Sequence, residues 1–385
     1  MDAMPLARTL PPLCRSFLAA LVLLTLLPGC GAGYVLRSGY YQMDLLAHRV
    51  PVEDALRSRD FTARERASFY VIRDAKAFGR EIGLSGTANY DTIAHDWDHA
   101  IWNVSASHPA RFENKTWSFP IVGTVPYLGF FREDQARELG AELAHEGYDV
   151  YVRTAGTYST LGWFEDPILR PMLSWSRYWL ANVVLHEMTH ATVWIPGSVN
   201  FNESFANFVG DVAAFRYLES RFGPDSPEFQ LAQADLADGE EWTRLLLGLY
   251  GDLERVYEDS ALAVEEKLAR KRVVLGTLLE RVDSSAIHDK AGYRAVVALG
   301  PWNNARLAQF RTYNDDRPAF QALLDAHNGD LQSFMRAVAE VTADREDPYE
   351  ALREAATRSG SGAGHDAMGV LEAQPDLAEA RGHDG

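Results

Sequence analysis

Two histidines and a glutamate form the segment of this sequence with the clearest chemical meaning. His186 and His190 stand four residues apart, and Glu187 directly follows the first. Residues spaced by four lie one above the other on one face of a helix, so both imidazoles can reach one Zn²⁺ at about 2.0–2.1 Å. Glu187 then projects toward the attacking water without ligating the metal, as a general base requires. The spacing therefore predicts a catalytic zinc helix.

A catalytic zinc ion needs a further protein ligand, and the next stretch of sequence offers one. Pro196 ends the predicted zinc helix, 178–193, and Asn202 is expected to N-cap a second helix over 203–222. Glu203, at the start of that helix, can turn back to the same metal. Two histidines and a glutamate leave the fourth position of a tetrahedral zinc site open, which is typical of catalytic sites. The alternative is a structural pair of core histidines beside a solvated glutamate.

The elements around this site follow from hydrophobic periodicity. Upstream, the sequence predicts helices over 34–56, 62–83 and 132–146, β-rich segments within 99–131, and a strand over 149–154. Downstream the pattern is almost wholly helical, with one or two long helices over 228–282 and a possible break between Gly248 and Gly251. We therefore expect a mainly helical α+β fold with a small mixed sheet and a helical C-terminal half.

The same patterns divide the chain into five segments. We expect a lipoprotein signal peptide over 1–29, an N-terminal helical segment over 30–98, the sheet and the zinc-site helices over 99–222, a helical region over 223–358 and a disordered tail over 359–385.

An apolar run at 17–27 has the length of a signal-peptide core and is too short to span a bilayer comfortably. It ends in Leu27-Pro28-Gly29-Cys30, which resembles a bacterial lipobox. In such signals the chain is cut before the cysteine, which then carries the lipid. No aspartate follows Cys30, so the resemblance implies the outer membrane, facing the periplasm. The alternatives are a plain secretory signal and an uncleaved N-terminal anchor.

The net charge argues against a nucleic-acid partner, and the cysteine content argues against a disulfide. The formal net charge is −17, and no long basic run offsets it, so nucleic acid is not expected as a partner. The chain has two cysteines, Cys14 and Cys30. Cleavage before Cys30 would remove the first and modify the second, so we expect no disulfide in the mature protein.

The ligand order resembles that of the gluzincin metallopeptidases, whose third ligand is a glutamate on the helix after the HExxH motif. That resemblance implies a gluzincin-like core around one Zn²⁺ per chain. In gluzincins an aspartate four residues after this glutamate bonds a ligand imidazole; here Asn207 holds that place, and its amide oxygen can still accept a hydrogen bond. The resemblance also implies a sheet-edge strand that pairs with substrate backbone, here at Ser159, Thr160, Leu161 and Gly162. A plain loop is the alternative.

Longer strings are similar to a bacterial family of predicted lipoproteins described as zinc aminopeptidases. The matching strings cover 39–42, 119–123, 158–164, 166–169, 186–190, 201–206 and 303–308. The resemblance extends from about Cys30 to about Val341. It implies that Tyr313, or else Arg306, donates to the developing oxyanion, although both residues could equally pack on a helix.

The aminopeptidase resemblance also requires an anion for the free amine of the substrate. Glu165 and Asp166 are the candidates, although Asp166-Pro167 equally indicates a turn. The Gly-x-Met-Glu-Asn string of well-known gluzincin aminopeptidases is absent, so amino-end specificity follows from the family resemblance alone.

Taken together, the sequence predicts a zinc-dependent aminopeptidase that acts on short peptides in the cell envelope. The alternatives are a zinc endopeptidase, a zinc hydrolase of another amide, and a non-catalytic envelope lipoprotein with a structural metal site. A partner-binding adaptor that uses the helices of 228–282 belongs to the last class. Glu187 favours catalysis, because a purely structural site needs no base beside its ligands.

Overall fold

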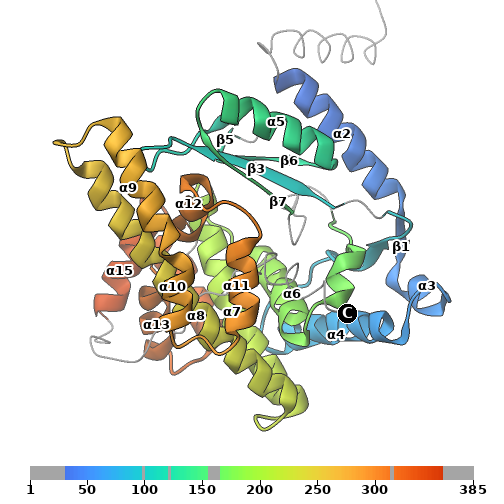
Figure 1. Ribbon diagram of the computed structural model, residues 1–385. Coiled ribbons are helices and arrows are strands. Elements are labelled where there is room, and N and C mark those ends of the chain that lie inside the picture. Colours follow the sequence, from blue (N-terminus) through green and yellow to red (C-terminus); the bar gives the residue numbers. More distant parts are fainter. Residues whose placement is uncertain (1–30, 98–99, 120–122, 155–164, 313–315, 359–385) are drawn as a thin grey trace, which may run out of the picture.

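The computed structural model describes residues 31–97, 100–119, 123–154, 165–312 and 316–358 (Figure 1). It is mainly helical with small sheets, which confirms the predicted α+β class. The named strands of the described residues all pair antiparallel, so the mixed sheet that we expected is wrong. The signal-peptide run at 17–27, Cys30 and the tail after residue 358 lie outside the described residues. Among the described helices, none combines the length and the apolar character needed to cross a bilayer.

The N-terminal part alternates helices with a two-stranded sheet. Its elements are α2 (Gly31–Ala47), β1 (Arg49–Pro51), α3 (Val52–Arg57), α4 (Ala63–Glu81) and β2 (Thr92–Ala94). The single helix predicted over 34–56 is therefore wrong, because β1 interrupts it. Pro51 explains the break, since it disfavours helical backbone at the residue before it. The predicted helix over 62–83 corresponds to α4, which begins with a capping box between Thr62 and Glu65.

Helix α2 has two different faces. On its inner face, the Tyr34 hydroxyl donates to the carbonyl of Gly129 at 2.9 Å. On its outer face, Leu36, Tyr40 and Met43 follow one another at helical spacing and are 59%, 69% and 61% exposed. This helix is thus fixed to the sheet on one side and leaves an apolar stripe on the other.

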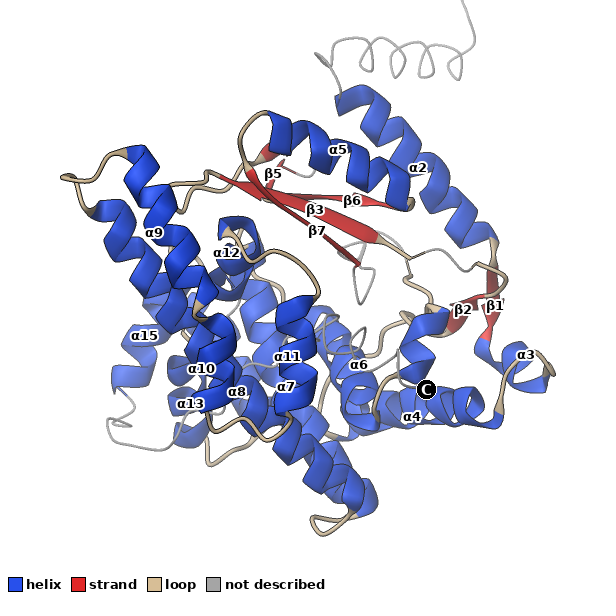
Figure 2. Ribbon diagram, viewed as in Figure 1, coloured by secondary structure: helices blue, strands red, loops and turns tan. Residues whose placement is uncertain are grey.

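The central sheet is three-stranded and antiparallel. It has the order β6-β3-β7, with β3 at Trp102–Ser107, β6 at Tyr127–Phe130 and β7 at Asp149–Thr154. Helix α5 (Glu133–His145) covers one face, and the helix that carries His186 and His190 lies on the opposite side (Figure 2). A separate hairpin pairs β4 (Trp117–Phe119) with β5 (Gly123–Val125). The predicted helix at 132–146 and the predicted strand at 149–154 are confirmed.

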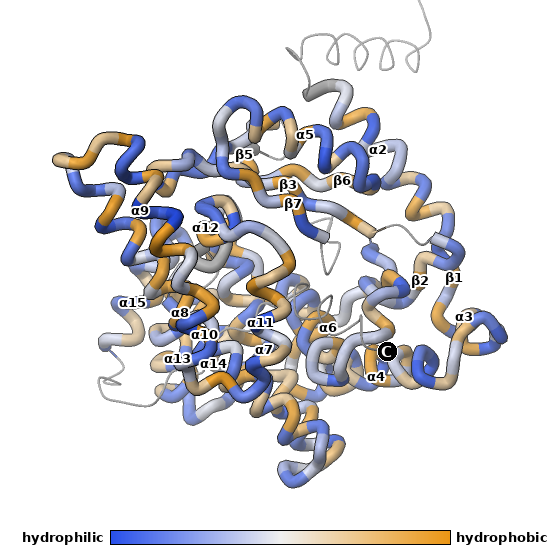
Figure 3. Tube along the Cα trace, in the orientation of Figure 1, coloured by the Kyte–Doolittle hydropathy of each residue, from blue (hydrophilic) through white to orange (hydrophobic). Residues whose placement is uncertain are grey.

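The rest of the chain is helical. After a short 3-10 turn at Arg170–Ser174 come α6 (Arg177–Thr192), α7 (Val199–Phe222), α8 (Pro227–Glu258), α9 (Val264–Gly276), α10 (Leu278–Ser284), α11 (Lys290–Ala298), α12 (Asn304–Thr312), α13 (Arg317–Ala326), α14 (Leu331–Thr342) and α15 (Pro348–Arg358). Hydrophobic and hydrophilic residues both recur along helices such as α2 and α5, as expected of amphipathic helices (Figure 3).

The break expected between Gly248 and Gly251 is wrong, because α8 continues through both glycines. Leu245, Leu249 and Leu253 recur every four residues and are buried against α10 and α11, so packing outweighs the low helix propensity of glycine. The chain leaves this helix only after Glu258.

The largest hydrophobic core surrounds the two helices that carry His186, His190 and Glu203. It joins α4, α6 and α7 to α13, α14 and α15. Phe205 and Phe208 of α7, for example, lie 5.8 Å and 5.5 Å from Phe320 of α13 between ring centroids. The site is therefore supported by residues far apart in the sequence.

Candidate metal centre

The candidate site lies between α6 and α7, which pack closely against each other. Tyr178, Asn182, His186 and His190 recur every four residues along α6, so they share one face of that helix. Gly210 of α7 faces this row: a Cβ atom there would lie 3.3 Å from the Asn182 carbonyl oxygen and 3.3 Å from the His186 Cβ. A glycine at 210 therefore allows the two helices their close approach.

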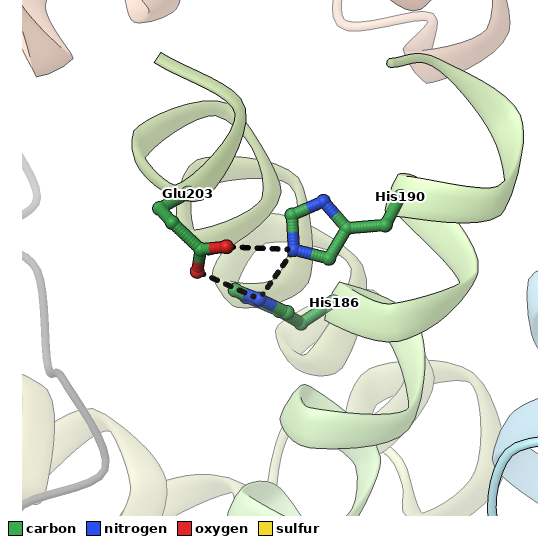
Figure 4. Close-up of side chains that lie close together, drawn as sticks. All are labelled: His186, His190 and Glu203. Carbon is green, nitrogen blue, oxygen red and sulfur yellow. Dashed lines mark hydrogen bonds and ion pairs between the residues drawn. The ribbon is translucent and has the colours of Figure 1, made fainter. Parts of the chain in front are cut away.

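Three side chains converge between these helices (Figure 4). The two imidazole Nε2 atoms of His186 and His190 are 3.0 Å apart. The carboxylate oxygens of Glu203 lie 3.5 Å from the His186 Nε2 and 3.4 Å from the His190 Nε2. In a tetrahedral zinc site with bonds of about 2.0–2.1 Å, neighbouring ligand atoms are about 3.3 Å apart. The three separations fit that geometry, and in the described part of the chain this is the cluster able to hold a metal ion.

Burial disfavours the charged forms of Glu203 and His186, but the attraction between the imidazoles and the carboxylates outweighs this effect. Burial acts to raise the pKa of Glu203, whereas both imidazoles together bring it far below its ordinary value of 4.5. Burial acts to lower the pKa of His186, whereas Glu203, Glu187 and Asp211 raise it above 6.5. The cluster thus favours positive charge beside its carboxylates, and a divalent cation can supply that charge in place of protons.

The connection between the two helices fixes the start of α7. The Asn202 side chain accepts from the backbone N–H of Ile195 and donates to its carbonyl, both at 2.8 Å. Helix α7 begins at Val199 with Ser198 before it, so the predicted role of Asn202 as N-cap of a helix starting at 203 is wrong. Asn202 instead clamps the loop within the first turn, and this clamp sets the position of the adjacent Glu203.

A buried carboxylate on α7 joins this helix to α6 and α13 through hydrogen bonds. Asp211, 1% exposed, accepts from the Tyr178 hydroxyl at 3.0 Å and from the Asn182 amide at 2.7 Å. Its other oxygen accepts from the Arg317 guanidinium of α13 at 2.8 Å. All three donors satisfy a charge that burial alone would destabilise. Asp211 was not among the residues predicted from the sequence, although it follows Glu203 by two helical turns in an apolar stretch.

Glu187 lies one residue beyond the first ligand and is 8% exposed. Its Oε2 accepts from the Nδ2 of Asn89 at 3.1 Å. Asn89 was not among the residues predicted from the sequence, because 98 residues separate it from Glu187 and spacing carries no signal over that distance.

Within the part of the chain that the structure describes, the remaining predicted site residues do not lie in the metal cluster. Asn207 lies one turn after Glu203, but among the described residues no ligand imidazole donates a hydrogen bond to its amide oxygen, and the His190 Nδ1 is buried without a partner there. Arg306 is 1% exposed, stacks on Trp302 at 3.8 Å and donates to the carbonyl of Val296, which are the contacts of a packing residue. Two further sets of predicted residues lie outside the described residues: Tyr313, and Ser159, Thr160, Leu161 and Gly162.

The two candidate amine-binding carboxylates differ in exposure. Glu165 is exposed, and its carbonyl accepts from Arg49 at 3.0 Å. Asp166 is 1% exposed, and its backbone N–H donates to the Asn89 Oδ1 at 3.1 Å. The structure thus brings this segment next to Glu187, with Asn89 between them.

One comparison with known proteins gives a match. A family model described as "Putative aminopeptidase" matches residues 33–352, which include the whole metal cluster and Asn89. No curated protein and no solved structure matches the chain.

Proposed function

Because this chain belongs to that aminopeptidase family, we propose that it is a zinc-dependent peptidase whose metal ligands are His186, His190 and Glu203. The resemblance to an aminopeptidase family predicted from the sequence is thereby confirmed at the level of the family. The zinc ion, the gluzincin-like core and the envelope location belong to the proposal.

The observation that carries the zinc assignment is the convergence of two imidazoles and one carboxylate at mutual distances of 3.0, 3.4 and 3.5 Å. When bound, Zn²⁺ polarises the scissile carbonyl and lowers the pKa of water to roughly 7. Glu187 takes the proton of the attacking water and gives it to the leaving amine. Its low exposure limits competing solvent around the proton it transfers.

We further propose that the enzyme removes residues from the amino end of short peptides. The family supports this specificity. A carboxylate beside the base would attract the terminal ammonium of a peptide, whereas an internal peptide bond carries no charge. Glu165 is the more accessible of the two candidates, because Asp166 is almost fully buried.

The envelope location is a proposal from the N-terminal sequence. The lipobox-like Cys30 directly precedes α2, and the exposed stripe of Leu36, Tyr40 and Met43 supports a helix that lies near a membrane surface. Mass spectrometry of the mature protein would detect a lipid on Cys30. An unmodified Cys30, or an uncut leader, would contradict the anchor.

The function is tested on the purified mature protein by metal analysis and peptide cleavage. We expect one zinc per chain, and cleavage of free-amine peptides that a chelator abolishes and added zinc restores. Glu187→Gln should retain zinc and lose about 10²–10⁴-fold in kcat. Cleavage of N-acetylated peptides at a comparable rate would make the enzyme an endopeptidase, and a wild-type protein with zinc but no cleavage would leave a structural metal site.

A further inference from the structure

Asn89 connects the proposed base to a distant segment of the chain. Its side chain is 8% exposed and uses both of its polar atoms. The Nδ2 donates to the Oε2 of Glu187 at 3.1 Å, and the Oδ1 accepts from the backbone N–H of Asp166 at 3.1 Å. A backbone N–H can only donate, so the amide oxygen must face residue 166. The amide nitrogen is then directed at the carboxylate.

The backbone at Asn89 is held in place from several sides. The next residue, Tyr90, is 2% exposed and has a φ of 65°, in the left-handed region that an aromatic residue rarely adopts. Lys76 of α4 donates to the Asn89 carbonyl at 2.8 Å and pairs with the Asp91 carboxylate. The Tyr90 N–H donates to the carbonyl of Asp166 at 2.8 Å. Such a conformation persists where its surroundings determine it, and it occurs often at functional sites.

Helix α4, which carries Lys76, is itself pressed against the zinc helix. A Cβ atom at Gly79 would lie 2.6 Å from the end of the Met188 side chain, which would then have to move, so the glycine allows α4 and α6 to pack closely. Helix α4 therefore contacts both the strained turn, through Lys76, and α6, the helix that carries Glu187.

We propose that Asn89 is a positioning residue for Glu187, an inference that builds on the proposed function. By holding Oε2, it fixes the rotation of the carboxylate. Because Oε2 accepts from Asn89, we assign the proton transfer from water to the other carboxylate oxygen, Oε1. Lys76 and the left-handed Tyr90 in turn fix the place of Asn89.

Two substitutions separate this role from a purely structural one. Asn89→Asp has nearly the same shape and keeps the acceptor for the N–H of residue 166, but it loses the donor to Glu187. Asn89→Ala removes both bonds without adding charge. The matched control is Thr87→Ala, because it removes the hydrogen bond from the Asn89 N–H to the Thr87 Oγ1, 3.1 Å long, and keeps the Lys76 and Tyr90 contacts that place Asn89.

The first measurement compares kcat, KM and zinc content for a free-amine peptide. For Asn89→Asp and Asn89→Ala we expect kcat to fall about 10–100-fold, as for partners that orient an active-site group, with KM and zinc content unchanged. Thr87→Ala should keep the wild-type kcat. Wild-type kcat in both Asn89 variants, or a loss matched by Thr87→Ala, would overturn the proposal.

The second measurement is a pair of double-mutant cycles between residues 89 and 187. If Asn89 acts through Glu187, then Asn89→Asp should lower kcat little further in the Glu187→Gln background. The unfolding free energies of Asn89→Ala, Glu187→Ala and the double variant should be non-additive, and this readout needs no activity. If the wild-type protein cleaves no peptide, the proposed function is refuted and the contact is not. If the unfolding free energies are additive, the contact between Asn89 and Glu187 is refuted.

Discussion

Gly210→Ala tests whether the spacing of α6 and α7 sets the metal geometry. The new Cβ would lie 3.3 Å from the Asn182 carbonyl oxygen, which is backbone and cannot rotate away. Contacts in this range force neighbouring atoms apart by a few tenths of an ångström. Glu203 lies on the same face of α7, two turns earlier, so the displacement is transmitted toward the ligand oxygens.

The expected loss of zinc affinity follows from how little the zinc–ligand distances can change. Zinc–ligand distances vary by only about 0.2 Å, so a shift of α7 by a few tenths of an ångström exceeds what the ligands can absorb without strain. We expect zinc affinity to fall about 10–100-fold, or about 1.4–2.8 kcal/mol. The same substitution raises helix propensity by about 1 kcal/mol, which offsets much of the strain in the free energy of unfolding.

The assay is a competition titration for zinc against a chelator of known affinity, with unfolding measured on the same metal-free samples. Gly251→Ala is the matched control, because a Cβ at that helical position would meet only the tip of Arg255, at 4.0 Å. It should stabilise the protein and leave zinc affinity unchanged. A Gly210→Ala protein that binds zinc as tightly as the wild type would refute the argument that helix spacing determines the ligand geometry.

Three further predictions concern single carboxylates. Glu203→Ala should lower zinc occupancy in metal analysis, because it deletes one of the proposed ligands; full occupancy would place the third ligand elsewhere. Glu165→Gln should raise KM for free-amine peptides about two- to fivefold at low salt with little change in kcat, since an exposed ion pair is worth about 0.5–1 kcal/mol; an unchanged KM would remove it as the amine anchor. For Glu65, burial acts to raise the pKa, but the Thr62 N–H and Arg170 bring it below its ordinary 4.5. Its charge therefore contributes stability above pH 4.5 that is lost as pH falls through the lowered pKa, so Glu65→Gln should destabilise at neutral pH and lose that effect in acid. Urea unfolding at both pH values measures this, and a pH-independent difference would contradict it.

The sequence predicted the convergence of the three proposed ligands because their geometry is local. His186 and His190 are joined by helical spacing, and Glu203 follows after one short loop. The strand at 149–154 and the helix at 132–146 were likewise visible in short-range periodicity. By contrast, the interruption of the first helix at β1 and the continuity of α8 depend on tertiary packing, which overrides local propensity.

The support of the site was not predictable in the same way. Asn89 reaches Glu187 across 98 residues, and Arg317 reaches Asp211 across 106. Neither pair has a spacing that any secondary structure imposes. Asp211 itself could have been suspected, because a lone charge in an apolar helix needs a buried partner.

The contacts around the site divide two tasks between different parts of the fold. The positions of the three proposed ligands are determined mainly by the α6–α7 pair, through the Asn202 clamp, the glycine contact at 210 and the Asp211 network, which Arg317 of α13 completes. The orientation of Glu187 is determined from outside that pair, by α4 and the strained turn at residues 89–91. Preorganisation of this kind requires that each group be locked by its own neighbours. Substitutions in α7 should therefore change zinc affinity before they change kcat of the zinc-loaded enzyme, whereas substitutions at Asn89 should change kcat at full zinc occupancy. A class of variants that shifted both quantities in constant proportion would show that the site responds as a single unit.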